Sequence, residues 1–300
     1  MSRGKCLNKD DLHLAFGIFY LCLSPIATVT NSFMLYVARR DPHRQFNKPT
    51  NVFNLGIARI YVFTALIVLP FIGIDSILQS QHLSPEGINA AKLFQDFLVC
   101  FVISSGCVIY LVISIERSTA VVFPVWNRKH VTVRRARILN TTITGICLLF
   151  SCILLTGIAP KYFYFAFIPI FVWLPCLGLL ILPAVGLYAL KRQARKIVAT
   201  MQTECLTCEA YNQKEKARRN AQIRRYLLES LRVTITSIII LGFFTVVKIL
   251  EMTRLELSCD ELLEHLSYTI LFVPVTLNPI ILLKKIPAYW KAAKHIWNRR

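Results

Sequence analysis

Seven long stretches of the sequence carry almost no charge, and polar segments separate each from the next. An α-helix crosses a bilayer with about 20 apolar residues at a rise of 1.5 Å per residue. Only helices and closed barrels satisfy their backbone in lipid, and a barrel shows alternating segments of about 10 residues. These continuous runs therefore predict an all-α membrane protein. They extend approximately over Leu12–Ala38, Val52–Ile74, Phe97–Ile115, Ile138–Pro160, Tyr162–Leu190, Val233–Leu250 and Leu262–Leu283.

The charge content excludes an ordinary soluble domain and predicts the orientation of the chain. Charged residues make up 17% of the sequence, whereas soluble domains carry about 25%. Most of the 35 Lys and Arg residues fall in alternate loops and in the C-terminal segment. The positive-inside rule then places the N-terminus outside and the C-terminus in the cytoplasm, which an odd number of crossings requires. We expect a multi-pass protein of the plasma membrane.

The net charge of +19 does not indicate nucleic-acid binding, because no basic, aromatic-interleaved soluble module is present. A basic inner face instead meets anionic lipid of the bilayer. The first stretch is too long for the apolar part of a signal peptide and ends in Arg39-Arg40, so we expect it to remain as a helix.

The sequence thus predicts a single seven-transmembrane domain over residues 1–300, a helix bundle with a short amphipathic eighth helix. Internal repeats are not evident, which disfavours transporters built from duplicated halves. We expect the helices at about 12–38, 50–74, 91–117, 137–159, 163–192, 226–251 and 261–283, and the amphipathic helix at about 286–297.

Four short motifs occur in four different predicted helices. They are Ser114-Ile115-Glu116-Arg117-Ser118 in the third, Leu277-Asn278-Pro279-Ile280-Ile281 in the seventh, Thr30-Asn31-Ser32 in the first, and Thr50-Asn51-Val52-Phe53 with Pro70 in the second. In helix, order and spacing they resemble the acidic-Arg-Tyr motif, the Asn-Pro motif, the first-helix asparagine and the second-helix register of rhodopsin-like (class A) G-protein-coupled receptors. The resemblance covers nearly the whole chain.

The resemblance implies a receptor that binds an extracellular ligand between the outer halves of its helices and signals to a heterotrimeric G protein. It implies that Glu116 restrains Arg117 at rest and that activation releases Arg117 toward the sixth helix. From the residues alone, the alternative is an interfacial ion pair that anchors the helix end. Pro279 removes a backbone donor and kinks its helix, which provides either a hinge or a static bend. The expected switch positions are Glu116, Arg117, Asn278, Pro279, Asn31, Tyr61 and Phe244.

Several positions depart from the pattern of that family. Leu282 replaces the tyrosine that follows the Asn-Pro motif, and Phe244 replaces the tryptophan of the sixth helix, which lacks its proline here. Tyr61 occupies the position of the family's sodium-binding aspartate, and Gly106 occupies that of its third-helix partner. Without a carboxylate to ligate a hard cation, we expect no modulation by sodium. The departures keep open an alternative, a seven-helix orphan protein with constitutive, weak or no G-protein coupling.

The ligand is expected between facing helices, where sites in helical bundles lie. Val99 occupies the position of the family's amine-binding aspartate, which disfavours a classical amine, and Phe272 occupies that of the retinal-binding lysine, which excludes an opsin. The candidate ligand-binding residues are Asp96, Val99, Cys100, Phe244, Lys248, Glu251, Glu264 and His265.

Lys248 is the most informative of these candidates, because a lysine at mid-membrane depth costs up to about 3 kcal/mol. We favour a side chain that reaches outward to the interface or pairs with Glu251 one turn later. If Lys248 faces inward instead, its partner is Asp96 or an anionic group of the ligand.

The remaining site predictions are few. Cys6 and Cys259 are the two cysteines placed outside, where a disulfide between them is possible. Cys205-x-x-Cys208 lacks a second pair of ligands, so we expect no metal site. We expect no cofactor and no enzymatic activity, since no catalytic pair of residues occurs at membrane depth.

Overall fold

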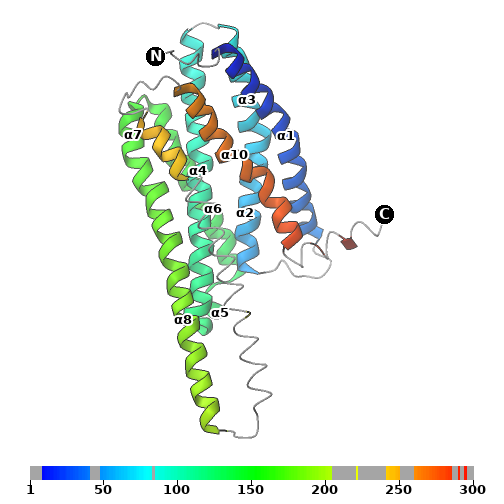
Figure 1. The fold of residues 1–300 in the computed structure, drawn as a ribbon, viewed down its shortest axis with the longest axis vertical. Helices are drawn as coiled ribbons and strands as arrows, with labels where there is room; N and C mark the ends of the chain where they lie inside the picture. Colours follow the sequence, from blue (N-terminus) through cyan, green and yellow to red (C-terminus); the bar gives the residue numbers. More distant parts are fainter. Residues whose placement is uncertain are drawn as a thin grey trace, which may run out of the picture.

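The structure is a computed structural model that describes residues 9–40, 48–82, 85–204, 221, 241–250, 260–285, 290 and 294–295. Within these ranges the chain is almost entirely helical, which confirms the predicted all-α fold class. The helices pack side by side along one direction (Figure 1). In chain order they are α1 (Lys9–Arg40), α2 (Pro49–Phe63), η1 (Thr64–Val68), α3 (Leu69–Ser80), α4 (Pro85–Val122), α5 (Pro124–His130), α6 (Val133–Cys152), η2 (Ile153–Thr156), α7 (Pro160–Phe167), η3 (Ile168–Trp173), α8 (Leu174–Glu204), the helix Leu241–Leu250 and α10 (Asp260–Lys285).

Five helical ranges among the described residues are long and apolar enough to cross a membrane. They are Lys9–Arg40, Pro49–Ser80, Ala90–Val122, Val133–Thr156 and Lys161–Gln193. Leu241–Leu250 is a shorter apolar helix, and α10 contains 26 residues. The predicted sixth helix, 226–251, is described only over 241–250, and of the predicted amphipathic helix, 286–297, only residues 290, 294 and 295 are described.

Large apolar side chains are exposed along the outside of the bundle. Examples are Val29 at 67%, Leu149 at 71% and Phe165 at 77% exposure, from three different helices. Large contiguous apolar patches are rare on soluble monomers and mark contacts with membranes or partners. The exposed side chains therefore agree with the prediction of a membrane protein.

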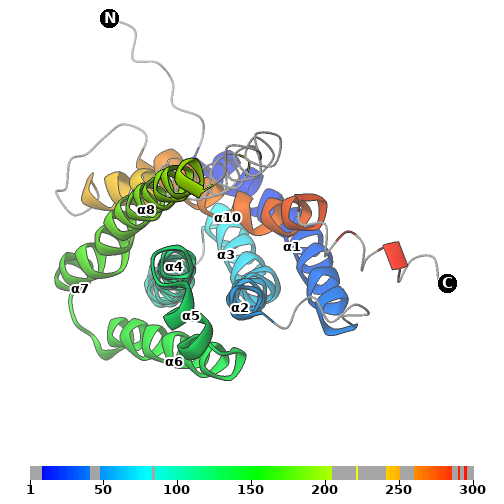
Figure 2. The same cartoon turned by 90° about the horizontal axis from the view of Figure 1, so that it is seen from below.

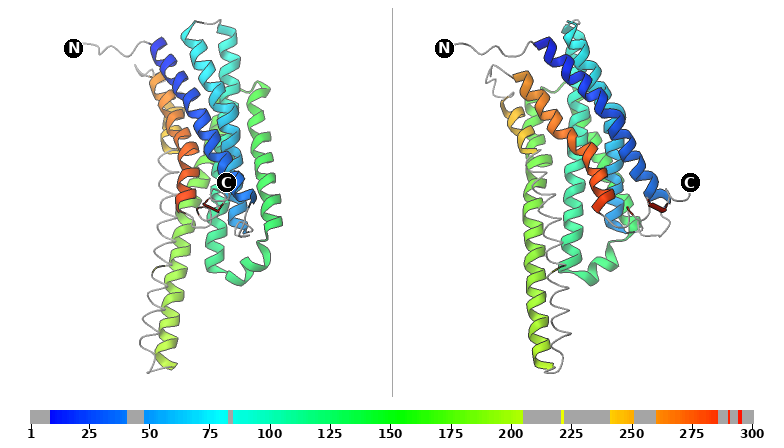
Figure 3. Two further views of the ribbon diagram at one scale, coloured as in Figure 1. Left: turned by 90° about the vertical axis from the view of Figure 1, so that its right-hand side faces the viewer. Right: turned by 45° about the vertical axis from the view of Figure 1, so that its right-hand side comes forward.

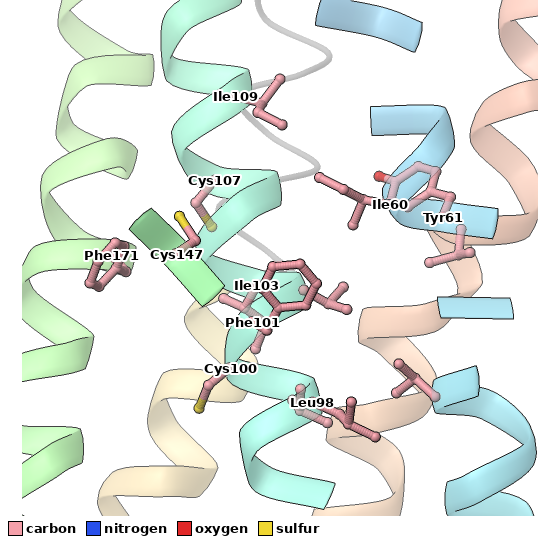
Figure 4. Packing of buried hydrophobic residues seen from close by; sticks show 14 of the residues in the cluster. Ile60, Tyr61, Leu98, Cys100, Phe101, Ile103, Cys107, Ile109, Cys147 and Phe171 are labelled. Atoms are coloured by element: carbon pink, nitrogen blue, oxygen red, sulfur yellow. The ribbon is translucent and has the colours of Figure 1, made fainter. Parts of the chain in front are cut away.

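Helix α4 lies in the interior of the bundle, between α2, α6 and α8 (Figure 2). In the most apolar 18-residue segment of this helix 67% of the residues are buried, whereas in that of α1 only 22% are buried. Side chains of α4 contribute to the core on several sides: Cys107 lies near Cys147 of α6 (Figure 4), and the ring of Phe101 packs on that of Phe63 in α2 with centroids 5.5 Å apart. At the other extreme, α8 projects beyond the other helices at the end opposite the N-terminus (Figures 1 and 3).

A π-helical segment, η1, interrupts the second span between α2 and α3. The N–H of Leu69 donates to the carbonyl of Thr64, five residues earlier. The same spacing would pair the carbonyl of Ala65 with Pro70, which has no N–H. The hydroxyl of Ser24 in α1 donates to the carbonyl of Ala65 at 2.7 Å instead. A neighbouring helix thus stabilises the distortion at Pro70.

Three glycines allow close contact between helices at two places. A Cβ on Gly17 of α1 would lie 2.8 Å from the carbonyl oxygen of Gly73 in α3, and a Cβ on Gly73 would lie 3.0 Å from that of Gly17. Without a Cβ on either side, the two backbones approach closely, as small residues permit in membrane helices. Likewise, Gly56 of α2 leaves the space that the side chain of Asn140 in α6 occupies.

Candidate functional site

An ion pair is buried near the end of the bundle at which α1, α4 and α10 begin. The ammonium group of Lys248 lies 3.3 Å from Oδ1 of Asp96 in α4, and their side chains are 2% and 9% exposed. A charge in such an environment is stable only when a partner and hydrogen bonds compensate its lost hydration. Lys248 and Asp96 supply that compensation to each other.

A second, more exposed ion pair lies beside the first. The ammonium group of Lys92 is 3.4 Å from Oε2 of Glu264, with side chains 42% and 23% exposed. The hydroxyl of Tyr268 links the two pairs, because it donates to Oε1 of Glu264 at 3.2 Å and lies 3.5 Å from Oδ1 of Asp96. We call these five residues, Lys92, Asp96, Lys248, Glu264 and Tyr268, the charge network.

Aromatic rings surround the buried ammonium group. The Nζ atom of Lys248 lies 5.2 Å from the ring centroid of Tyr164 and 6.0 Å from that of Tyr268. Such cation–π contacts contribute about 2 kcal/mol when both groups are desolvated. Cys100 completes this side of the site, with its Sγ 3.8 Å from the hydroxyl of Tyr164.

The first part of the favoured interpretation of Lys248, a side chain reaching outward to the interface, is wrong, and the second, a pair with Glu251, stays a prediction. The whole residue is only 1% exposed, and it faces Asp96 across the bundle. The carboxylate and the two tyrosine rings compensate the charge, so reaching the interface offers no advantage. The alternative prediction, an inward lysine paired with Asp96, is the one that the structure shows. Glu251 lies outside the described residues.

Helical spacing explains why these residues meet. Lys92, Asp96 and Cys100 are four residues apart on α4 and therefore share one face. Glu264, Tyr268 and Phe272 repeat that spacing on α10. These two helix faces meet Lys248 and the ring of Tyr164, and so bring the members of the charge network together.

His265 belongs to a different contact, between α10 and α1. Its Nε2 lies 2.9 Å from Nδ1 of His13, and its ring stacks on Phe16 with centroids 4.8 Å apart. The hydroxyl of Tyr20 donates to the backbone carbonyl of His265 at 2.9 Å. The structure therefore places this predicted ligand-binding residue against α1, next to the charge network in sequence but in another set of contacts.

Two further candidates are buried in the apolar core. Val99 is 1% exposed and Phe244 is not exposed at all. Both pack within the hydrophobic cluster and make none of the polar contacts of the charge network.

A second polar cluster joins three helices deeper in the bundle. The side-chain amide of Asn278 in α10 donates to the hydroxyls of Tyr61 in α2 and Tyr110 in α4, each at 3.0 Å. The two hydroxyls are themselves 3.0 Å apart. We call Tyr61, Tyr110 and Asn278 the tyrosine–asparagine junction. Tyr61 is the residue that, by the resemblance, replaces a sodium-binding aspartate.

Asn31 and Pro279 lie in a related contact between α1 and α10. Asn31 is fully buried and donates through Nδ2 to the carbonyls of Ala27 and Val275, both at 2.8 Å. Pro279 is buried inside α10, and the helix continues through it to Lys285.

The opposite end of α4 carries Glu116 and Arg117, which are both half-buried. The hydroxyl of Thr50 at the start of α2 donates to Oε2 of Glu116 at 2.7 Å. Ser118 donates to the carbonyl of Leu182 in α8 at 2.9 Å. The first bond ties Glu116 to α2, and the second ties the end of α4 to α8.

The described residues include no group of three or more His, Cys, Asp or Glu side chains that could hold a metal ion. The described cysteines, Cys22, Cys100, Cys107, Cys147, Cys152 and Cys176, are free thiols. Cys6 and Cys259, the predicted disulfide pair, lie outside the described residues.

Three residues that matter in these clusters were missed by the sequence reasoning: Tyr110, Tyr164 and Tyr268. A signal existed for Tyr268, because it lies four residues after Glu264 on the same face of a helix. Tyr110 and Tyr164 give no such signal, since their partners are more than 45 residues away in sequence.

No model of a known protein family matches the chain, and no curated protein matches it.

Proposed function

We propose that the chain is a seven-transmembrane receptor of the rhodopsin-like type. It binds an extracellular ligand between the outer halves of its helices and signals to a heterotrimeric G protein through the inner face that carries Glu116 and Arg117. In this proposal the end of the bundle at which α1 begins faces outward, and the long basic extension of α8 faces the cytoplasm of a cell whose plasma membrane the helices cross. The helix Leu241–Leu250 and α10 belong to the sixth and seventh crossings.

The tyrosine–asparagine junction carries the proposal. Asn278 and Tyr61 were selected from the sequence as switch positions in two different helices, and their side chains are in hydrogen-bond contact. A hydrogen-bonded contact among α2, α4 and α10 couples three helices that a receptor must rearrange to signal. The network gives the chain a discrete set of bonds that is either made or broken, as a two-state element requires.

The inner face supports the same function. Glu116 accepts a hydrogen bond from Thr50, so the resting arrangement ties α4 to α2 beside Arg117. A bond between half-buried groups is weak enough to exchange for contacts with a bound G protein. Activation then consists of the release of this end of α4 and exposure of Arg117.

A second candidate is a seven-helix protein with constitutive, weak or no G-protein coupling. The departures at Phe244 and Leu282 favour it, because the residues that the receptor family uses to transmit activation are different here. The two candidates differ in whether signalling responds to a ligand.

A G-protein dissociation panel in cells separates them. The wild-type chain is compared with Arg117→Ala across a ligand library and without ligand, and Arg39→Ala, an exposed arginine at the end of α1, serves as the matched control. A receptor gives ligand-dependent dissociation that Arg117→Ala reduces and Arg39→Ala does not. Signalling that no ligand changes supports the second candidate, and signalling that Arg117→Ala leaves intact refutes the role of the inner face.

A further inference from the structure

A short helix with exposed apolar side chains lies at the end of the bundle from which α8 projects (Figures 1 and 3). Helix α5 has seven residues, and none of them is buried. Just before it and within it, three large apolar side chains are exposed: Phe123 at 60%, Val125 at 81% and Trp126 at 52%. The ring of Trp126 stacks on that of His130, with centroids 4.9 Å apart. Neighbouring exposed apolar side chains of this size mark a contact surface.

Cations gather at the corner where α5 ends and α6 begins. Five Lys and Arg residues fall within ten positions: Arg128, Lys129, Arg134, Arg135 and Arg137. The guanidinium group of Arg135 donates to the backbone carbonyl of His130 at 3.0 Å, which holds the first turn of α6 against the last turn of α5. The sequence has no Asp or Glu from position 117 to position 203, and no carboxylate of the described residues lies within ion-pair distance of these five side chains. The corner therefore concentrates positive charge.

The outer surface of α6 indicates the depth of this corner in the membrane. Arg134 and Arg135 each lie four residues before an exposed apolar side chain, Ile138 at 58% and Leu139 at 44%. Residues four apart share a helix face and differ in height by about 6 Å. The exposed apolar side chains of α6 face hydrocarbon in the proposed membrane arrangement, so the two arginines lie one turn away from it, at the level of the lipid headgroups.

We propose that α5 and the start of α6 form a docking site for an anionic lipid of the cytoplasmic leaflet, one whose headgroup carries several phosphates. Phe123, Val125 and Trp126 enter the outer part of the bilayer, and the five cations bind the phosphate groups. We call these eight residues the lipid corner. The inference rests on the orientation proposed above, which places α5 on the cytoplasmic side.

The combination of apolar and basic side chains favours a lipid over a soluble anion. A soluble anion would contact the cations and leave the three apolar side chains in water. A membrane surface takes up both kinds of side chain, as it does with amphipathic helices that lie in the interface. Trp126 fits this position, because tryptophan is enriched where headgroups meet acyl chains.

The number of cations favours a headgroup with several phosphates. Clusters of about four to eight Lys and Arg beside a membrane helix are typical of sites for phosphatidylserine or phosphorylated inositol lipids. Arginine binds a phosphate group through two parallel hydrogen bonds, and four of the five cations are arginines. A headgroup with several phosphates contacts several of them at once, whereas phosphatidylserine offers one phosphate and one carboxylate.

The first test compares lipids on the wild-type protein. Purified full-length protein in detergent micelles receives phosphatidylcholine, phosphatidylserine or a phosphatidylinositol bisphosphate, and native mass spectrometry measures how much of each lipid it retains. We expect the bisphosphate to bind at least about 10-fold more tightly than phosphatidylserine supplied at equal total charge. Equal retention at equal charge shows a diffuse attraction and overturns the proposed site.

Two variants that lose the same number of charges test the location. One replaces four cations of the lipid corner and keeps Arg135, whose bond to His130 holds α6 against α5. It is Arg128→Gln/Lys129→Gln/Arg134→Gln/Arg137→Gln. The matched control replaces four exposed cations at the ends of two other helices, and it is Arg39→Gln/Arg40→Gln/Lys191→Gln/Arg192→Gln.

We expect the corner variant to lose at least about 30-fold in affinity for the bisphosphate, and the control to lose less than about threefold. The replaced side chains are exposed in both variants, so the helices should fold as in the wild-type protein. Equal losses in the two variants mean that net charge alone attracts the lipid, and they overturn the proposal.

The depth of α5 is tested separately by fluorescence. In Trp173→Phe/Trp290→Phe/Trp297→Phe, Trp126 is the remaining one of the four tryptophans. Nanodiscs are prepared from lipids brominated near the headgroup end of their acyl chains, because bromine quenches a tryptophan that enters the bilayer. We expect a loss of Trp126 emission relative to unbrominated lipid. Unchanged emission places α5 in water, and emission that responds only to added G protein assigns α5 to a protein partner. Either result overturns the lipid site.

These measurements need neither an extracellular ligand nor signalling, so the two proposals fail separately. Selective binding of the bisphosphate without G-protein dissociation in cells refutes the signalling function and leaves the lipid corner intact. Ligand-dependent dissociation that requires Arg117, from a protein that retains the bisphosphate no better than phosphatidylserine, refutes the lipid corner and leaves the receptor.

Discussion

The side-chain amide of Asn31 in α1 donates to the backbone carbonyl of Val275 in α10 at 2.8 Å. Val275 lies four residues before Pro279, so its carbonyl would accept from the N–H that proline lacks. Asn31 therefore supplies the donor that the helix cannot supply to itself. In a bilayer no water is available for this role, and the alternative is an unsatisfied carbonyl.

Ser24 performs the same role for another helix. Its hydroxyl donates to the carbonyl of Ala65, the acceptor that the π-helical segment η1 leaves open before Pro70. Ser24 and Asn31 are seven residues apart, which places them on the same face of α1. One face of α1 thus compensates the proline distortions of the second span and of α10.

Asn31→Ala should destabilise the protein. The variant leaves the carbonyl of Val275 without a donor, and interhelical hydrogen bonds in membranes contribute about 1 kcal/mol. We expect a lower melting temperature for the purified protein in detergent. Thr30→Ala is the matched control, because its hydroxyl bonds only to carbonyls of its own helix. An unchanged melting temperature for Asn31→Ala would show that the carbonyl finds another donor.

The positions of Asn31, Pro70 and Pro279 could be read from the sequence, whereas their compensation could not. Helix length and apolar composition follow from local sequence, so the predicted all-α fold and membrane character agree with the structure. Which carbonyl a side chain reaches depends on how α1 packs against α3 and α10, and no local pattern encodes that. The two asparagines divide the roles: Asn31 donates to the backbone carbonyl that Pro279 leaves open, and Asn278 donates to two hydroxyls.

Tyr110→Phe should increase ligand-independent signalling if the junction stabilises the resting state. The variant removes the hydroxyl that bonds to Tyr61 and accepts from Asn278, and a loss of about 1 kcal/mol changes the ratio of two states about fivefold. Basal G-protein dissociation in cells measures the effect at matched surface expression.

Tyr188→Phe is the control for that comparison, because Tyr188 is 69% exposed on α8. Equal basal signalling in Tyr110→Phe and the wild-type protein would mean that the junction does not restrain activation. Tyr61→Phe should give a similar increase, and the double variant should add less than the sum, since the two hydroxyls share one set of bonds.

Sodium should not change ligand affinity. The resemblance to class A receptors implies a sodium-binding carboxylate at the position of Tyr61, whose hydroxyl here contacts Tyr110 and Asn278. Gly106, at the partner position, has no side chain that could ligate a cation. Binding measured in sodium and in choline chloride at equal ionic strength should agree. A sodium effect that Tyr61→Phe abolishes would contradict the prediction.

The buried pair of Lys248 and Asp96 shows where prediction from the sequence reaches its limit. The cost of a lysine in an apolar helix was evident, and Asp96 was among its possible partners. Whether Lys248 points outward or toward Asp96 depends on the rotation of two helices about their axes, which sequence spacing within each helix does not determine. The tyrosine rings at 5.2 and 6.0 Å that favour the inward position come from other elements of the fold.

Lys248→Ala should destabilise the protein more than the removal of both charges. The single variant leaves Asp96 buried without its cation, and breaking a buried pair in this way costs about 3–5 kcal/mol. Lys248→Met/Asp96→Leu removes both members of the buried pair together, so we expect a melting temperature close to that of the wild-type protein. Thermal unfolding of both variants in one detergent tests this order. A double variant less stable than Lys248→Ala would show that the pair itself, and not its imbalance, determines stability.

Gly56→Ala should separate α2 from α6. A Cβ at this position would collide with the side chain of Asn140, which is only 6% exposed. Forcing one extra carbon into a filled contact costs about 1–3 kcal/mol. Asn140→Ala removes the obstacle, so the double variant should recover most of the loss in melting temperature. Gly145→Ala on α6 is the control, because its Cβ would meet nothing within 4 Å and alanine favours the helix. If Asn140→Ala fails to rescue Gly56→Ala, the loss arises from the backbone of α2 and not from contact between the helices.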